Sequence, residues 1–454
     1  MSEDTIAAIS TPIGEGGIAI IRLSGPGALG IADTVFESSR GKPSEYLSHT
    51  IHFGTIGTNG DLIDQVMLTV MRAPRTYTLE DVVEINCHGG LLTARKVLAK
   101  CLQNGARLAE PGEFTKRAFL NGRIDLTQAE AVMDMISAKT DHAHSAAARI
   151  LDGHLSRKIE HARDWLITVL AHLEAHIDFP DEDIAPDSRD KLLADLEEVV
   201  ESLRRLLATA HEGKILREGL AVVIIGRPNA GKSSLMNALL GEDRSIVTPI
   251  PGTTRDTIEE IANVRGVPIR FTDTAGIREA RGKVERVGVD RTRKALATCE
   301  LVLHVFDRSR RFSTEDRQLV RLYASKPVIH VLSKSDLPRR LILPQDFPDA
   351  NAVEVSVVTS DGIERLKTLI EEHVWSRRGR AEVSPIAINA RHADALRRAI
   401  DSLLDGISQM RQRAPMEIVS QQIRIGLNAA GEIVGKTSTD DILDKIFSTF
   451  CIGK

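Results

Sequence analysis

The sequence predicts a multidomain fold of α/β and all-α parts: an N-terminal α/β domain, then a helical domain interrupted by an inserted α/β domain. Three observations predict it. The length of 454 residues corresponds to about three ordinary domains. Short β-prone runs fill the first 120 residues, whereas residues from about 126 to 217 are rich in Ala, Leu, Glu and His at helical spacing. Apolar runs alternate with helical stretches after residue 219, and the pattern is helical again from about residue 386.

We expect the domain boundaries to lie where the composition and the hydrophobic pattern of the sequence change. The N-terminal domain should span residues 1–120, and the first part of the helical domain residues 121–217. The inserted domain should span 218–380, and the second helical part 381–454. A domain inserted into another is tolerated where the two ends of the insert lie close together.

The elements of the first two parts follow from local patterns. The helical part opens with TQAE at residues 127–130, which has the form of a capping box and predicts a helix start at Thr127. The helical pattern breaks at Phe179–Asp183 and resumes over Asp187–His211. In the N-terminal domain, short apolar runs bounded by Gly, Pro and Asn predict strands at Ile18–Leu23, Val66–Val70 and Val82–Ile85.

In the inserted domain, continuous apolar runs predict strands that are buried on both faces. Because helical stretches separate these strands, they predict a doubly wound parallel sheet. The strands are expected at Leu220–Ile225, Leu301–Phe306 and Val328–Leu332. The C-terminal part is expected to form helices over Ala395–Met410, Met416–Ala430 and Asp440–Phe450.

The composition excludes several classes of protein. Lys and Arg total 59 and Asp and Glu total 63, giving a net charge of −4, which argues against a broad basic face for nucleic acid. Any RNA contact would therefore be local or shared with a partner. Aromatic residues make up only 4% of the chain, which disfavours extended base-stacking platforms.

The remaining compositional features concern metal sites, membranes and compartment. The four cysteines, Cys87, Cys101, Cys299 and Cys451, form no C-x-x-C pair, which disfavours a disulfide framework and a structural zinc site. No run of 18 apolar residues occurs. The acidic start lacks the pattern of a signal or transit peptide, so we expect a cytoplasmic protein.

A phosphate-binding loop is predicted at GRPNAGKS, Gly226–Ser233, which fits G-x-x-x-x-G-K-[ST]. The motif follows a predicted strand and leads into a helical pattern, the context that such a loop requires. Backbone N–H groups and the helix N-terminus can then cradle phosphates. Lys232 is expected to reach the β and γ oxygens, and the Ser233 hydroxyl to bind Mg²⁺.

Three further motifs follow at the order and spacing of a GTPase. GTTRD at 252–256 offers a second hydroxyl for Mg²⁺, and DTAG at 273–276 places Asp273 near the metal and the Gly276 N–H near the γ-phosphate. SKSD at 333–336 follows a predicted strand, and Asp336 can accept hydrogen bonds from guanine that adenine cannot donate. Together the four motifs predict a GTP-binding domain of the Ras-like P-loop type.

Two residues depart from the common GTPase pattern. Ser333 stands where an Asn is usual, so affinity for the base is expected to be weaker. Ile277 stands where Ras-like GTPases have the Gln that orients water, and an apolar side chain cannot do this. Glu279 and Glu285 are the acidic candidates nearby.

Over its whole length the chain resembles the MnmE (TrmE) family of tRNA-modification GTPases. The resemblance rests on the P-loop and on DTAGIREA at 273–280, which is followed by Val284-Glu285-Arg286. Its most specific motifs are PGEFTKRAFLNGRID at 111–125, IDFPDE at 177–182 and the terminal CIGK at 451–454.

For the inserted domain, the resemblance implies GTP hydrolysis that depends on a potassium ion instead of an arginine finger. The potassium ligands are expected from Asn229, Thr248, Ile250 and Thr253, and the Mg²⁺ ligands from Ser233 and Thr254. Glu285 matches the glutamate that positions the attacking water, and acts with Lys232 and Gly276. The full set of expected GTP-binding residues is Gly226, Asn229, Ala230, Gly231, Lys232, Ser233, Ser234, Thr248, Thr253, Thr254, Asp273, Thr274, Ala275, Gly276, Lys334, Asp336 and Ser356.

For the N-terminal domain, the resemblance implies binding of 5-formyl- or 5,10-methylene-tetrahydrofolate. The folate positions are Arg22, Glu84, Arg123 and Lys454, and the third is commonly Lys, so its charge is kept. Leu79 stands where the family often has Gly, which leaves the local turn geometry open. Cys451 has either a redox or nucleophilic role near the folate, or a packing role.

The resemblance also implies partners and an overall reaction. It implies a homodimer that forms a heterotetramer with an MnmG-like flavoprotein, which binds FAD and NADH. The complex would install a carboxymethylaminomethyl-type group at C5 of the wobble uridine of certain tRNAs. Two other functions stay open: a regulatory GTPase switch of the ribosome-assembly type, and a folate-dependent methyltransferase with a regulatory GTPase domain.

Metal binding outside the nucleotide site is disfavoured. His172 and His176 have the spacing of a zinc pair, but the glutamate of H-E-x-x-H is not in place. Cys87 and His88 are adjacent and cannot easily share one ion, so a turn after a strand is preferred. The acidic residues 181–183 are interpreted as a solvated loop, with pairing to a basic partner as the alternative.

Overall fold

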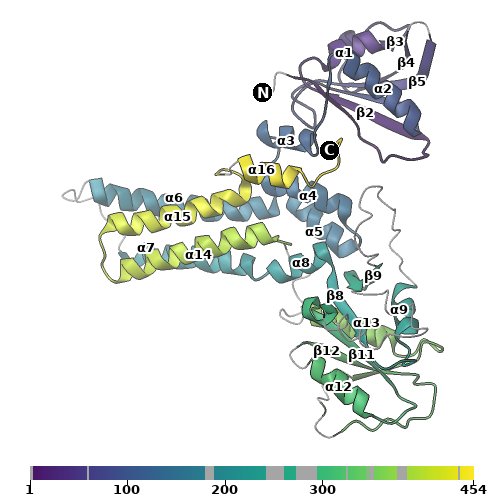
Figure 1. The fold of residues 1–454 in the computed structure, drawn as a ribbon. Coiled ribbons are helices and arrows are strands. Elements are labelled where there is room, and N and C mark those ends of the chain that lie inside the picture. Colours follow the sequence, from purple (N-terminus) through teal and green to yellow (C-terminus); the bar gives the residue numbers. More distant parts are fainter. Residues whose placement is uncertain are drawn as a thin grey trace. The chain divides into compact units, whose positions relative to one another are not determined.

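The computed structural model describes residues 4–58, 61–178, 189–241, 260–271, 294–323, 326–344, 347, 352–375, 386–437 and 440–454. The chain divides into two compact units. The first comprises Met1–Met133, Ser156–Pro186 and Ser408–Lys454, and the second Asp134–Leu155 and Asp187–Ile407. A seven-stranded sheet, a set of helices and a six-stranded sheet are present, which confirms the predicted combination of α/β and all-α parts (Figure 1).

The first unit contains the seven-stranded sheet, in the order β3-β4-β5-β6-β2-β1-β7. Neighbouring strands are antiparallel, except that β1 and β7 are parallel. The strands are β1 Ile6–Ile9, β2 Ile18–Ser24, β3 Phe36–Glu37, β4 Thr50–Thr58, β5 Asp61–Met71, β6 Val82–His88 and β7 Arg107–Leu108. The three strands predicted in this domain are thus confirmed. The turn predicted at Cys87 and His88 is wrong, because both residues belong to the end of β6 and the bend follows at Gly89.

Two helices, α1 Ala28–Val35 and α2 Leu91–Gln103, cover one face of this sheet. Side chains of the strands alternate between the two faces, so that Ile21 and Leu23 pack into the core under these helices. On the other face, Ile51, Phe53 and Met67 of β4 and β5 are exposed, Phe53 to 59%. Among the described residues, this second face of the sheet therefore exposes apolar side chains along β4 and β5.

The helix predicted to start at Thr127 begins earlier. Helix α4 spans Leu126–Ser137, and its cap is Asp125, whose carboxylate accepts from the Gln128 N–H at 3.0 Å. The Gln128 side-chain oxygen accepts in turn from the Asp125 N–H at 3.0 Å. The capping box is therefore D-x-x-Q and not T-x-x-E. The prediction was wrong because both tetrapeptides fit the box, and the Thr127 hydroxyl binds Asp125 instead.

The helical run predicted over Asp187–His211 is two helices in the second unit. Helix α7 spans Arg189–Leu207 and α8 spans Ala210–Glu218. The break is at Thr209, whose hydroxyl contacts the carbonyl oxygens of Leu206 at 2.7 Å and Ile386 at 2.8 Å. A hydroxyl that bonds to the backbone in this way competes with the regular helix.

The remaining helices agree with the predicted pattern apart from their ends. Helix α15 extends four residues beyond its predicted end at Ala430, to Val434, because Gly435 in the left-handed conformation stops it there. Helix α16 ends at Phe447 and not at Phe450. The bounds are α3 Glu113–Leu120, α5 Asp141–Leu151, α6 His154–Asp178, α14 Ala390–Arg411, α15 Met416–Val434 and α16 Asp440–Phe447.

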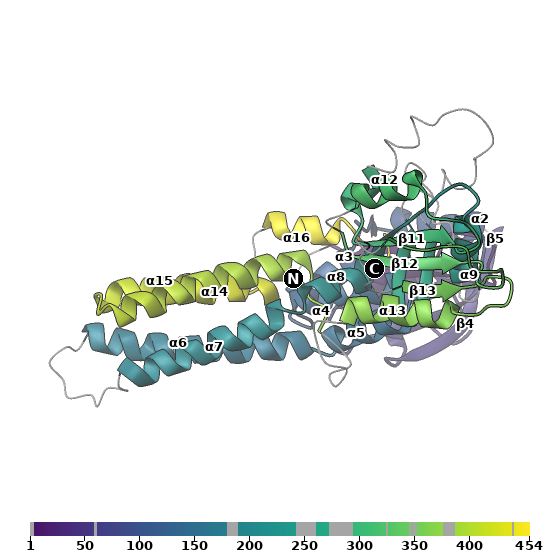
Figure 2. The same ribbon diagram turned by 90° about the horizontal axis from the view of Figure 1, so that it is seen from below.

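The second unit contains the six-stranded sheet, in the order β13-β12-β11-β8-β10-β9. Helices α9 and α13 pack on one face and α12 on the other (Figure 2). The strands are β8 Leu220–Ile225, β9 Glu260–Val264, β10 Val267–Phe271, β11 Leu301–Asp307, β12 Val328–Ser333 and β13 Ala352–Val355. The helices are α9 Lys232–Leu240, α12 Thr314–Leu322 and α13 Ile363–Trp375.

The predicted parallel sheet has one strand that the sequence did not predict, the edge strand β9, which is antiparallel to β10. The two strands are joined by Arg265 and Gly266, which have φ of 51° and 86°. A two-residue turn with positive φ at both positions makes a hairpin, and a parallel crossover needs a much longer connection.

A buried cluster of two histidines and a tyrosine lies in this sheet. His304 of β11 is 0% exposed, and its Nδ1 lies 2.7 Å from the Tyr323 hydroxyl. That hydroxyl lies 3.5 Å from Nε2 of His330 on β12. Burial, together with the nearby charges of His330 and Lys232, lowers the pKa of His304 to about 3.

The second unit should therefore lose stability in acid. Unfolded His304 takes up a proton below its ordinary pKa of 6.5, whereas folded His304 stays neutral down to about 3. The free energy of unfolding should thus fall between these two pH values, by about 1.4 kcal/mol per pH unit for one group. Urea unfolding followed by circular dichroism at pH 7, 6 and 5 measures this slope, and His304→Phe should reduce it. Equal slopes in the two proteins would contradict the assignment.

Candidate functional site

The predicted P-loop lies between β8 and α9, and its backbone has the required shape. Gly226 has φ of 148°, and a Cβ there would lie 2.3 Å from the Val305 carbonyl oxygen of β11. Asn229 and Gly231 have φ of 62° and 98°. Gly231 is the N-cap of α9, so the loop directs the start of a helix toward its concave side.

The side chain of Lys232 folds over the loop. Its Nζ donates to the carbonyl oxygens of Gly226 at 2.9 Å and Arg227 at 2.7 Å. Burial lowers the pKa of Lys232 below the usual value for lysine. A partly desolvated ammonium group at the start of a helix is suited to binding phosphate oxygens.

The loop that follows β12 is tied to the P-loop. The Ser333 hydroxyl donates to the Ala230 carbonyl oxygen at 2.6 Å, and it also lies 3.0 Å from the Phe306 carbonyl oxygen. Lys334, with φ of 61°, donates from Nζ to the Asn229 carbonyl oxygen at 3.0 Å. The two segments that the sequence assigned to phosphate and guanine are thus brought together by direct hydrogen bonds.

Asp307 completes this junction and was missed in the sequence. Its carboxylate accepts from Lys334 Nζ at 2.7 Å. Burial opposes its ionisation, but hydrogen bonds from Lys334 and Ser309 outweigh burial and hold the pKa of Asp307 below its usual value. The sequence feature that could have identified Asp307 is its position as an acidic residue directly after the predicted buried strand Leu301–Phe306.

Asp336 and Ser356 also meet. The exposed Asp336 carboxylate accepts from the Ser356 hydroxyl at 2.6 Å, and Ser356 itself is buried. This bond holds one carboxylate oxygen of Asp336. Other expected residues lie outside the described part of the chain: Thr248, Ile250, Thr253, Thr254, Asp273, Thr274, Ala275, Gly276, Ile277, Glu279 and Glu285.

The four residues expected to bind folate lie in the first unit. Arg22 of β2 and Glu84 of β6 are directly opposed in the antiparallel register and form an ion pair of 2.8 Å. The Arg22 guanidinium lies 5.7 Å from the centre of the Phe114 ring. Phe114 is at the start of α3, on the sheet face opposite to α1 and α2.

The C-terminal tail docks at the same place. The Phe114 N–H donates to the Lys454 carbonyl oxygen at 3.2 Å, and the Gly112 N–H to that of Cys451 at 3.4 Å. Gly453 has φ of 99°, and a Cβ there would lie 2.4 Å from the Ile9 carbonyl oxygen. The tail therefore packs closely on β1, and the Cys451 side chain is left exposed.

Arg123 reaches the same region through Tyr77. It donates from Nη1 to the Tyr77 carbonyl oxygen at 2.9 Å, and its guanidinium lies 4.8 Å from the centre of the Tyr77 ring. The hydroxyls of Tyr77 and Thr115 are 3.0 Å apart. Phe114 and Thr115, adjacent in sequence, thus link Arg22, Lys454 and Arg123. Sequence reasoning did not single them out, although both lie in the 111–125 motif.

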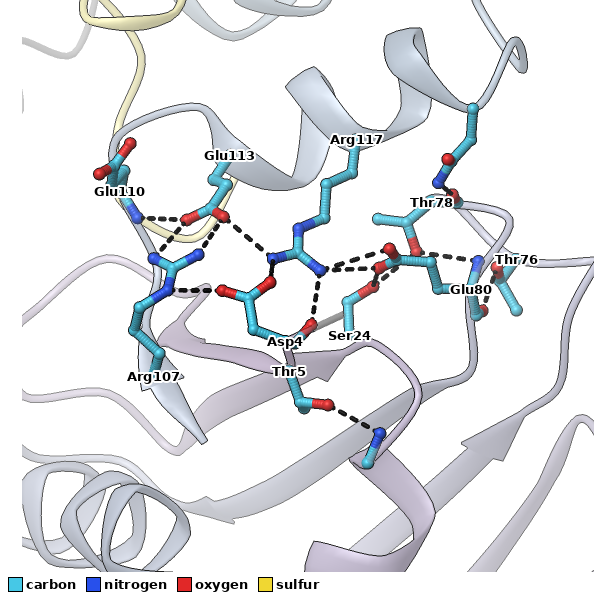
Figure 3. Close-up of polar contacts among 12 residues, drawn as sticks. Asp4, Thr5, Ser24, Thr76, Thr78, Glu80, Arg107, Glu110, Glu113 and Arg117 are labelled. Atoms are coloured by element: carbon cyan, nitrogen blue, oxygen red, sulfur yellow. Dashed lines mark hydrogen bonds and ion pairs between the residues drawn. The ribbon is translucent and has the colours of Figure 1, made fainter. Parts of the chain in front are cut away.

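An ion network beneath these residues holds α3 to the strands (Figure 3). Arg117 of α3 is 5% exposed and contacts Asp4 Oδ1 at 2.8 Å, Glu113 at 3.1 Å and Glu80 at 3.3 Å. Arg107 contacts Asp4 and Glu113 from the other side, at 2.8 and 2.6 Å. Hydrogen bonds from Arg107 outweigh burial and hold the pKa of both carboxyl groups below the usual range.

Leu79 adopts the left-handed conformation, with φ of 59°. The Leu side chain at this family glycine position therefore keeps the turn that glycine would favour. A cavity of about 310 Å³ lies between the β1–β2 loop and the start of α2. Its lining includes Ile9, Thr11, Ile18 and Gly90.

No helix in the described ranges is long and apolar enough to cross a membrane. Among the same residues, no group of three or more His, Cys, Asp or Glu side chains could hold a metal ion. His172 and His176 are both half-buried on α6.

Two family models match the chain. The MnmE helical domain matches residues 126–451, and the GTP-binding protein TrmE N-terminus matches residues 5–123. Among solved structures, the G domain of the T. maritima FeoB iron transporter is 25% identical, covers 34% of this chain and 98% of that chain, and has a TM-score of 0.24. Era from Aquifex aeolicus is 24% identical, covers 40% of this chain and 66% of that chain, and also has a TM-score of 0.24. TM-scores this low establish no common fold for the whole chain.

The curated relatives match over the whole length. The tRNA modification GTPase MnmE of Listeria welshimeri is 48% identical over 458 residues, covering 100% of both chains. The proteins of the same name from Alkaliphilus metalliredigens and Clostridioides difficile are each 45% identical, covering 100% of this chain and 99% of theirs. The chain therefore belongs to the MnmE family of tRNA modification GTPases.

Proposed function

We propose that this protein hydrolyses GTP to drive a carboxymethylaminomethyl-type modification of the wobble uridine in certain tRNAs. The observation that carries this is the direct hydrogen bonding between the P-loop and the Ser333–Asp336 loop, in a chain 45–48% identical to tRNA modification GTPases. Lys232, which would bind phosphate, and Asp336, which would select guanine, lie on the two segments that this junction joins. GTP and Mg²⁺ are the ligands that it requires.

Two metal ions would act on the phosphates. Ser233 and Thr254 would hold Mg²⁺, and Asn229, Thr248, Thr253 and the backbone of Ile250 would hold K⁺. Side-chain and carbonyl oxygens of this kind suit hard cations. When bound, K⁺ supplies positive charge that stabilises the transferring phosphoryl group, as an arginine finger does in other GTPases.

The other catalytic roles belong to side chains and backbone. Lys232 binds the β- and γ-phosphate oxygens, and the Gly276 N–H binds the γ-phosphate. Glu285 holds the attacking water, a role that the apolar Ile277 side chain cannot perform. Asp307 keeps Lys334 in place beside Asn229, which steadies the P-loop.

The first unit would bind a reduced folate as one-carbon donor. Arg22, Arg123 and Lys454 offer three positive charges for the carboxylates of the ligand, and Glu84 offers an acceptor for the N–H groups of its pterin ring. The contacts through Phe114, Thr115 and Tyr77, described above, support one shared site. Cys451 is exposed nearby, which leaves both a redox role and a packing role open.

The partners are proposed on the same basis. The apolar face along β4 and β5, with Ile51, Phe53 and Met67 exposed, supports a homodimer. An MnmG-like flavoprotein would supply the redox chemistry, because no redox cofactor follows from the motifs of this chain. With a net charge of −4, tRNA would be held jointly with that partner.

Nucleoside analysis of tRNA tests the proposed reaction. Cells that lack this chain should lose the modified wobble uridine and accumulate its unmodified form, measured by mass spectrometry of digested tRNA. The wild-type chain should restore the modification, and Asp336→Asn, which weakens recognition of guanine, should restore less. Unchanged tRNA in the deleted strain would favour the regulatory switch instead.

The GTPase rate should be at least about tenfold higher in K⁺ than in Na⁺ at equal ionic strength, because K⁺ would supply charge comparable to an arginine finger. Phosphate release under single-turnover conditions measures it. Glu285→Ala is the control: it should remove hydrolysis in K⁺ while leaving GTP affinity nearly unchanged. Equal rates in the two salts would rule out the potassium mechanism.

Arg22→Ala should weaken binding of 5-formyl-tetrahydrofolate by about tenfold or more, because a charge-assisted hydrogen bond is lost. Isothermal titration calorimetry of the full chain measures the affinity. Arg95→Ala, an exposed arginine of α2, is the matched control and should bind as the wild type does. An unaffected titration with Arg22→Ala would argue against this site.

A further inference from the structure

We propose that Tyr77 contacts the bound folate and that the Glu80–Arg117 ion pair positions it. The inference deepens the proposed folate site and rests on it. Tyr77 lies in the turn Thr76–Glu80 between β5 and β6, and it is not among the four residues that the family resemblance assigns.

The carbonyl oxygen, the ring and the hydroxyl of Tyr77 each contact a residue of the candidate folate site. Its carbonyl oxygen accepts from Arg123, its ring lies under the Arg123 guanidinium, and its hydroxyl meets Thr115. The ring is half-buried, so part of its surface remains accessible. Arg123 is thereby held over an aromatic ring, which limits its rotamers. A guanidinium has five N–H donors, and the bond to the Tyr77 carbonyl oxygen uses one of them.

This pair matches the chemistry of a reduced folate. The ligand combines ring systems with the carboxylates of its glutamate tail. A tyrosine ring offers a surface on which a ligand ring can pack, and the neighbouring guanidinium offers paired donors for a carboxylate. Tyr77 and Arg123 therefore present side by side the two kinds of group that this ligand requires.

The turn that carries Tyr77 is held from several directions. The Thr76 hydroxyl donates to the Glu80 carbonyl oxygen at 2.6 Å, and the Ser24 hydroxyl donates to Glu80 Oε2 at 2.7 Å. The Asn121 side chain donates to the Thr78 carbonyl oxygen at 2.7 Å. Leu79 lies between these anchors with positive φ, a conformation that persists only where the surroundings impose it.

Arg117 is the anchor that joins this turn to α3. Its Nη1 lies 3.3 Å from both carboxylate oxygens of Glu80, and the two side chains are 5% and 8% exposed (Figure 3). Removing one member of a buried ion pair leaves the other uncompensated. Without Arg117, the Glu80 carboxylate would lose its ion pair with α3, which would loosen the hold of α3 on the turn that carries Tyr77.

Arg107 provides a matched control. It binds Asp4 and Glu113, as Arg117 does, but it makes no contact with Glu80 in the described structure. A change at Arg107 therefore disturbs the same network without releasing the turn. If the Glu80–Arg117 ion pair positions Tyr77, a substitution of Arg117 should weaken folate binding more than the same substitution of Arg107.

Fluorine NMR of the full chain labelled with 3-fluorotyrosine tests the contact directly. The chain has three tyrosines, Tyr46, Tyr77 and Tyr323, and Tyr77→Phe assigns the resonance of interest. Saturation with 5-formyl-tetrahydrofolate should shift the Tyr77 resonance. Tyr46, which is buried against His52, and Tyr323, which is in the second unit, should not shift.

Calorimetric titration with the same compound measures the energetic effect. Tyr77→Leu should weaken binding by about tenfold, because a ring contact is lost, whereas Tyr77→Phe should bind almost as the wild type. Arg117→Gln should also weaken binding and should move the Tyr77 resonance of the free protein but not that of Tyr46. Arg117→Lys should restore part of the affinity, and Arg107→Gln should leave it close to wild type.

The possible failures are distinguishable. If the wild type does not bind the folate, the proposed folate site itself is wrong. If the wild type binds and Tyr77→Leu binds equally well, Tyr77 makes no contact. If Arg107→Gln and Arg117→Gln weaken binding equally, the network maintains the fold and does not position the turn. Should Arg117→Gln fail to fold, Glu80→Gln replaces it, with the same expected loss of affinity and the same control.

Discussion

A buried guanidinium, that of Arg117, is the constraint on which the first unit depends. A fully buried positive charge is costly unless carboxylates and hydrogen bonds surround it. Here Asp4 comes from the chain before β1, Glu80 from the turn before β6, and Glu113 from α3 itself. Satisfying one side chain therefore fixes three segments that are far apart in the sequence.

The consequences of this constraint extend to the candidate folate residues. Once α3 is held by Arg117, its first residues, Phe114 and Thr115, lie where the C-terminal tail and Tyr77 can reach them. The tail then packs on Ile9 through Gly453, which has no side chain to prevent the approach. The residues around the candidate folate site therefore come from both ends of the chain.

The second unit uses the same principle with neutral groups. The Ser333 hydroxyl of β12 donates to a carbonyl oxygen of the P-loop and also contacts one of β11. Although serine is smaller than the usual asparagine, Ser333 therefore still connects the segment expected to bind guanine to the P-loop.

Local patterns predicted most elements but not every boundary. The apolar run at Leu220–Ile225 has the same bounds in the structure because all six residues are buried, and a glycine flanks the run at each end. The start of α4 was wrong, because two overlapping capping boxes satisfy the same rule and only Asp125 has its partner in place. The antiparallel β9 was also missed, since its edge position depends on a turn of only two residues.

The sequence by itself determined the family and the P-loop, because these depend on residue type and spacing along the chain, and it predicted the selection of guanine by Asp336 and the order of domains. Only the tertiary structure decided that Asp307 steadies Lys334, that Phe114 and Tyr77 link the candidate folate residues, and that Arg117 holds the turn of Leu79. The reason is physical: these roles depend on contacts between segments up to hundreds of residues apart, and burial determines which polar groups must find each other.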